Sequence, residues 1–133
     1  MLRFVLTTTL VVCITAFSYA GDTVFTKITA KKVGMNVEIV AEGTNTIDVG
    51  ETFAGWTPAF VRPDGTLAPA TILQFDTPAP GGKAGVFRIK YLALDPKGAD
   101  KGDWRARSAL NWTTAGGMGA KIKDSGLVTL PVP

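Results

Sequence analysis

Three aspartates lie close together in the last third of the sequence, and carboxylates of this kind are ligands for hard cations such as calcium. They are Asp95, Asp100 and Asp103. Two lysines are interspersed with them, and the spacing differs from that of an EF-hand loop. The stretch therefore predicts a solvated loop between two strands, with a weak calcium site as the alternative.

Histidine is absent from the sequence, and this removes the usual general base of Ser and Cys nucleophile systems. It also removes the commonest ligand of zinc, copper and haem iron. The only cysteine, Cys13, lies in an apolar run near the N-terminus, and no glycine motif for phosphate or dinucleotide binding is present. We therefore expect no cofactor and no catalytic site. A hydrolase that uses two carboxylates stays as a third hypothesis, because two acids can act as acid and base.

Basic residues occur as three pairs spaced two residues apart, and in a strand each pair points to one side. The pairs are Arg88 and Lys90, Arg105 and Arg107, and Lys121 and Lys123. If the three strands are neighbours, their outer faces form one cationic surface that could bind anionic glycans, phosphate head groups or nucleic acid. The alternative is an ordinary solvated face whose charges are balanced by neighbouring acids.

Trp56 lies in a Gly-Trp-Thr-Pro segment that the sequence places in an irregular loop. An exposed indole there could stack on a sugar, together with Tyr91, whereas packing in the core is the alternative. Trp104 and Trp112 are eight residues apart, and hence on one face of an unbroken strand. They are therefore core candidates.

Short segments with alternating apolar and polar residues, separated by Gly, Pro, Asn and Asp, dominate the sequence and predict strands. The predicted strands span 23–30, 33–39, 60–62, 71–76, 86–94, 104–112 and one or two strands within 120–132. Turns are expected at 42–45 and 63–66, breakers at 78–82, another turn at 116–119 and irregular chain at 50–58. The pattern is typical of an all-β antiparallel sandwich, Ig-like or jelly-roll-like, with about seven short strands. A short helix over 105–112 is the alternative for that segment.

Residues 1–20 have the three zones of a cleavable signal peptide. A short start with Arg3 precedes an uncharged apolar run, and Ser18 and Ala20 place small residues at −3 and −1 of a cut before Gly21. The run is shorter than the roughly 20 residues of a membrane-spanning helix. The residue before Cys13 is Val, whereas a lipid-modified cysteine normally follows Gly or Ala. We therefore expect export, with residues 21–133 as a single domain.

Cleavage would leave about 113 residues, enough to bury a core of its own. It would also remove the cysteine and Arg3, so that the formal charge falls from +3 to +2. Such a charge gives no general attraction to nucleic acid or membranes. We expect no membrane-spanning segment after cleavage, and a location in the bacterial periplasm, at the cell surface or outside the cell.

The general pattern resembles chaperone–usher fimbrial subunits: a signal peptide, a small all-β body and no required histidine. That resemblance implies assembly with other protein subunits through an N-terminal extension, for which residues 23–30 are the candidate. The same segment could instead be the first strand of its own domain. The leading hypothesis is a non-catalytic surface protein, either an assembly subunit, possible as an oligomer, or an adhesin-like module. The second hypothesis is a secreted recognition protein that binds carbohydrate or inhibits an enzyme.

Overall fold

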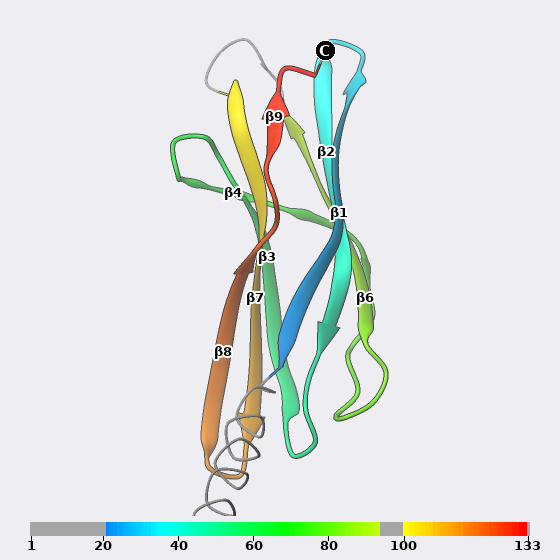
Figure 1. Cartoon of the computed structure of the whole chain (residues 1–133), viewed down its shortest axis with the longest axis vertical. Helices are drawn as coiled ribbons and strands as arrows, with labels where there is room; N and C mark the ends of the chain where they lie inside the picture. The colour runs from blue at the N-terminus through cyan, green and yellow to red at the C-terminus, as the bar shows by residue number, and fades with distance from the viewer. Residues whose placement is uncertain (1–20, 94–99, 133) are drawn as a thin grey trace, which may run out of the picture.

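The structure is a computed structural model, which describes residues 21–93 and 100–132. It contains two antiparallel sheets that pack together, with the strands running along the long axis (Figure 1). This confirms the predicted β-sandwich. The strands are β1 (Asp22–Val33), β2 (Asn36–Thr46), β3 (Thr52–Val61), β4 (Leu67–Pro69), β5 (Thr71–Phe75), β6 (Gly85–Ala93), β7 (Gly102–Thr114), β8 (Gly117–Asp124) and β9 (Val128–Leu130).

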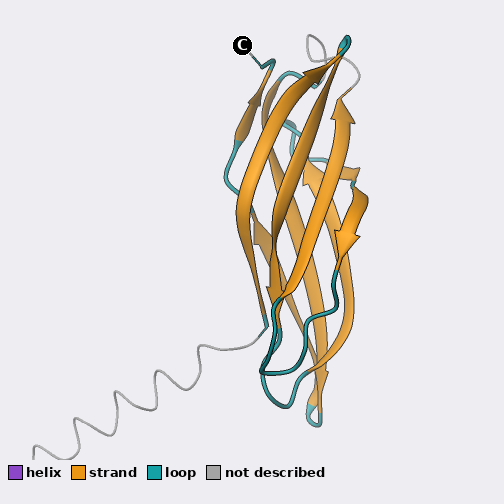
Figure 2. Cartoon of the chain, turned by 90° about the vertical axis from the view of Figure 1, so that its right-hand side faces the viewer, coloured by secondary structure: helices purple, strands orange, loops and turns teal. Residues whose placement is uncertain are grey.

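The first sheet has the strand order β1-β2-β6-β5, and the second has the order β4-β3-β7-β8. The short strand β9 pairs with the first residues of β7, beyond the end of β8. In Figure 2 the first sheet faces the viewer and lies in front of the second. In chain order this is the A-B-E-D and C-F-G arrangement of immunoglobulin-like sandwiches, with β4 added beside the C strand. The topology thus favours the Ig-like form of the prediction over the jelly roll.

The core lies between the sheets and is built from alternate residues of the central strands. Trp104, Phe60, Phe87, Ile39 and Ile89 are its largest fully buried side chains. A smaller cluster comprises Ile47, Leu110 and Trp112. The predicted core placement of both tryptophans on β7 is confirmed.

The alternation of buried and exposed residues in strand β1 shifts by one residue partway along the strand. Thr23 and Phe25 are directed towards the core, whereas Val24 is half exposed. A bulge opposite β2, between Phe25 and Lys27, shifts the alternation by one, so that Ile28 packs on the core. A strict alternation of inner and outer residues is therefore wrong for this strand, because a bulge adds one residue to it.

The turn predicted at 42–45 is wrong, because these residues lie within β2. At Gly43 a Cβ atom would lie 2.7 Å from Cζ of Phe87, so the glycine makes room for a core aromatic ring. The turn that follows β2 lies later, at Val49 and Gly50. Another turn, at Gly34 and Met35, interrupts the predicted strand 33–39, and Met35 is 93% exposed although the alternation places it with buried residues.

The irregular segment predicted at 50–58 is also wrong, since most of it belongs to β3. Pro58 lacks an N–H, which argues against a central strand. The strand tolerates Pro58 because β4 pairs only with Ala59–Val61, so β3 has one neighbour at the proline.

The segment 105–112 is strand rather than helix. The predicted turn at 63–66 is confirmed, with Gly65 at a positive φ of 88°. Residues 21–93 and 100–132 form nine strands, where the sequence predicts about seven.

Candidate functional site

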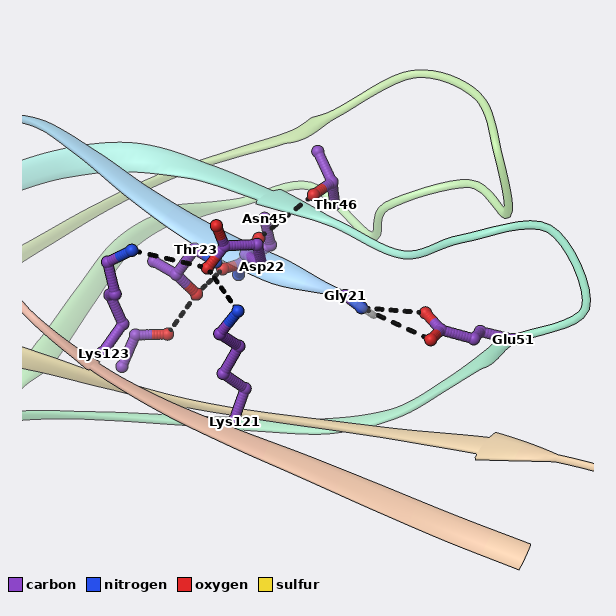
Figure 3. Close-up of polar contacts among 9 residues, drawn as sticks. Gly21, Asp22, Thr23, Asn45, Thr46, Glu51, Lys121 and Lys123 are labelled. Atoms are coloured by element: carbon purple, nitrogen blue, oxygen red, sulfur yellow. Dashed lines mark hydrogen bonds and ion pairs between the residues drawn. The ribbon is translucent and has the colours of Figure 1, made fainter. Parts of the chain in front are cut away.

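The first described residue, Gly21, is bound to a buried carboxylate (Figure 3). Its backbone nitrogen donates to both side-chain oxygens of Glu51, with distances of 3.1 Å to Oε2 and 3.3 Å to Oε1. Glu51 is only 7% exposed, and its Oε2 also accepts from the backbone nitrogen of Asp48 at 2.7 Å. The turn before β3 therefore holds the start of β1 through a single acidic side chain.

The next residue, Asp22, bridges the gap between β1 and β8, the edge strands on one side of the sandwich. Its Oδ1 lies 3.5 Å from Nζ of Lys121 and 3.7 Å from Nζ of Lys123 (Figure 3). These lysines leave β8 on the face directed towards the first sheet, because they are opposite the buried residues Leu110 and Ser108 of β7. The side chains are each about a third or more exposed, so the pairs add little stability.

A chain of buried hydrogen bonds then joins the two sheets. Trp56 Nε1 donates to Ser108 Oγ at 2.9 Å, and Ser108 Oγ lies 2.7 Å from Thr23 Oγ1. Thr23 donates its own hydroxyl proton to Asn45 Oδ1 at 2.6 Å, so Ser108 must be the donor to Thr23. In the described part of the chain, Asn45 Nδ2 is the buried side-chain polar atom without a partner. Antibody domains join the strands equivalent to β2 and β7 with a disulfide. Here the hydroxyl groups of Ser108 and Thr23 and the side-chain amide of Asn45 connect β7 to β2.

The three basic pairs lie on three different surfaces and form no common cationic face. The condition for such a face is not met, because β6 lies in the other sheet from β7 and β8. Arg88 and Lys90 lie on the outer face of the first sheet, where Arg88 Nε is 3.2 Å from Glu42 Oε1. Lys121 and Lys123 face Asp22.

Arg105 and Arg107 share one acid on the outer face of the second sheet. Their Nε atoms lie 2.9 and 2.7 Å from the two carboxylate oxygens of Asp124. The hydrogen bond from Arg107 lowers the pKa of Asp124, and partial burial opposes this effect. The same bond raises the pKa of Arg107. Asp124 therefore offsets one of the two positive charges that these arginines carry.

The two aromatic candidates for ligand binding are packed into the protein. Trp56 lies on β3, where its ring stacks on Phe75 with centroids 4.8 Å apart and lies 4.9 Å from Phe87. Tyr91 stacks on Trp104 at 5.0 Å. The expectation of a loop around Trp56 is corrected, since the indole serves the core and the hydrogen-bond chain.

The candidate calcium ligands are only partly described. Asp95 lies outside the described residues, as do Ala20 and the rest of the predicted signal peptide. The carbonyl of Asp100 accepts from Trp104 Nε1, and the Asp103 carboxylate accepts from the Thr129 hydroxyl. No group of three possible metal ligands is found among residues 21–93 and 100–132.

The outer faces of the two sheets differ in how their charged residues are distributed. On the second sheet, three cross-strand rows of β3, β7 and β8 consist of uncharged residues, which we call the uncharged face. They are Thr52, Thr113 and Met118; Gly55, Asn111 and Ala120; and Thr57, Ala109 and Ile122. Met118 is 82% and Ile122 64% exposed. Sequence reasoning missed this face, although residues 109, 111 and 113 alternate with the buried side of the predicted strand.

On the first sheet, β1, β2 and β6 form what we call the charged face. Lys27, Glu42 and Arg88 are neighbours in one row, and Lys31 lies opposite Glu38 in another. Glu42 of β2 thus separates Lys27 of β1 from Arg88 of β6, which is an arrangement suited to solvent.

Comparison of the chain with family models, curated proteins and solved structures gives no match. Among the described residues, no helix is long and apolar enough to cross a membrane.

Proposed function

We propose that the chain is exported, is cut before Gly21, and then acts without catalysis as a subunit of a cell-surface assembly. Its contact with another copy is made by the uncharged face. The exposed, uncharged outer surface of β3, β7 and β8 is the single observation that supports this proposal most.

Charged residues are depleted at the centres of protein interfaces, because a buried charge needs a partner. The uncharged face meets this condition over nine residues, with Met118 and Ile122 as its exposed apolar side chains. Thr57, Ala109 and Ala120 are short, so they leave a surface on which a second sheet can lie. Two such faces can meet without burying an unpaired charge.

Assembly by exchange of an N-terminal strand is less favoured. Residues Asp22–Val33 pair with β2 of the same chain, and their first residues are bound by Glu51, Asn45 and Ser108. Release of this strand would break all these contacts. We therefore place the contact on a sheet face.

Sedimentation velocity over a range of concentrations tests the proposal. The chain beginning at Gly21 should associate, and Ile122→Lys should run as a monomer, because it places a charge in the centre of the contact. Leu92→Lys is the matched control: Leu92 is 40% exposed on the charged face, opposite Glu38, and its exchange should leave association unchanged.

A wild-type chain that stays monomeric at every concentration would contradict self-assembly and favour the second hypothesis, a secreted recognition protein. Equal association of the wild type and Ile122→Lys would show that the contact lies elsewhere.

A further inference from the structure

We propose that the Glu51 carboxylate is a binding site for the α-ammonium group of Gly21. This inference rests on the export part of the proposed function and is independent of what the uncharged face binds. Signal peptidase hydrolysis breaks the C–N bond between Ala20 and Gly21 with addition of water. The products are a carboxylate on Ala20 and an amine on Gly21, which takes up a proton at neutral pH.

The charge of Glu51 is the first reason. A buried carboxylate is costly unless it is paired and hydrogen-bonded. Within the described part of the chain, no Lys or Arg forms an ion pair with Glu51. Its partners are the backbone nitrogens of Gly21 and Asp48. Cleavage would turn the first of these into a cation.

The geometry of the contact is the second reason. One nitrogen lies 3.1 and 3.3 Å from the two carboxylate oxygens, within reach of both. An amide has a single N–H to share between them, whereas an ammonium group has three. Charge-assisted hydrogen bonds are roughly twice as strong as neutral ones.

The fit of glycine is the third reason. A Cβ atom on residue 21 would lie 2.8 Å from the carbonyl oxygen of Thr46 and 3.2 Å from Cγ2 of Ile47. It would also lie 3.3 Å from Oε2 of Glu51. The pocket thus accepts a residue without a side chain, and the predicted cut supplies glycine as the new first residue.

The consequence is that processing stabilises the fold. The uncut chain presents a neutral amide to Glu51, and the cut chain presents a cation. The exported form should therefore be more stable than the precursor, without any change in the rest of the sandwich.

Urea unfolding of two forms tests this inference. One form begins at Gly21 with a free amine, and the other retains residues 18–20, so that Gly21 keeps an amide. The unfolding equilibrium constant of the first form should be at least about tenfold smaller. Glu51→Gln should abolish this difference, and the control Glu38→Gln, on a half-buried residue of β2, should preserve it.

A second measurement covers the case in which Glu51→Gln fails to fold. Acetylation of the wild type at neutral pH, followed by mass spectrometry, should modify the Gly21 amine at least about tenfold more slowly in the folded protein than in the same chain unfolded in urea. Equal stability of the two wild-type forms, or a Gly21 amine that reacts as fast in the folded chain as in the unfolded chain, would overturn the inference and leave export intact. Mass spectrometry of the exported protein gives its first residue. A first residue other than Gly21 would contradict both the inference and the proposed cleavage, whereas sedimentation behaviour would affect only the assembly proposal.

Discussion

The two outer faces of the sandwich are built on the same core yet differ in chemistry. On the charged face, Glu42 lies between Lys27 and Arg88. On the uncharged face, the corresponding central row is Thr57, Ala109 and Ile122. On both faces, the outward residues of each strand alternate with buried ones, so the core does not dictate this difference. The outer positions are where the sequence is free to specify a partner.

The largest expected effect on stability comes from a substitution in the core, which both faces share. Phe87→Ala deletes a fully buried ring that lies 5.6 Å from Phe25 and 4.9 Å from Trp56. We expect the free energy of unfolding to fall by about 3–5 kcal/mol. Urea unfolding measures it, and a loss below about 1 kcal/mol would contradict the described core.

The next effect distinguishes the inner side of β7 from its outer side. Ser108→Ala leaves Trp56 Nε1 without its acceptor and Thr23 without its donor, and should lower stability by about 1–3 kcal/mol. Ala109→Ser changes the adjacent outward residue and should remain within about 0.5 kcal/mol of the wild type. Equal effects of the two exchanges would contradict the orientation of β7.

A smaller effect belongs to the ion pairs at the end of the uncharged face. Arg107 lowers the pKa of Asp124, so the folded protein holds the Asp124 charge more firmly than the unfolded chain. The resulting stability is present above the unfolded pKa of about 3.9 and is lost as pH falls through the lower folded value. Asp124→Asn should therefore cost less than about 1 kcal/mol at neutral pH and nothing at the acid end of a pH series. A constant difference across the series would contradict this.

The smallest effect on stability is expected within the uncharged face itself. Ile122→Lys should change the free energy of unfolding by no more than about 0.5 kcal/mol, because the side chain is largely exposed. Thermal or urea unfolding measures it. A loss of several kcal/mol would mean that Ile122 supports the fold rather than a contact.

Much of the fold could be predicted from the sequence, because alternation around Val37, Ile89 and Trp104 follows the burial of single strands. The exceptions are local. Gly43 and Pro58 are turn or breaker residues by type, but each lies in a strand whose neighbours accommodate it. Alternation gives no sign of the bulge in β1.

The candidate site could be predicted less well, because it depends on pairing between distant strands. The spacing of the basic pairs is visible in the sequence, but only the strand order determines which acids they meet, namely Glu42, Asp22 and Asp124. Glu51 resembled any other acid in the sequence, and only its burial beside Gly21 distinguishes it. Neither the acids that meet the basic pairs nor the burial of Glu51 can be read from the sequence alone.

Methyl NMR of the chain beginning at Gly21, recorded from low to high protein concentration, tests the assembly proposal most directly. The methyl signals of Ile122 and Met118 report on the uncharged face, and those of Val24, Val86 and Leu92 on exposed positions of the first sheet. We predict shifts that grow with concentration for Ile122 and Met118 and stay near zero for the other three residues. Shifts at Val24, Val86 and Leu92 instead, or no shift at any residue, would contradict the proposal that this protein acts through its uncharged face.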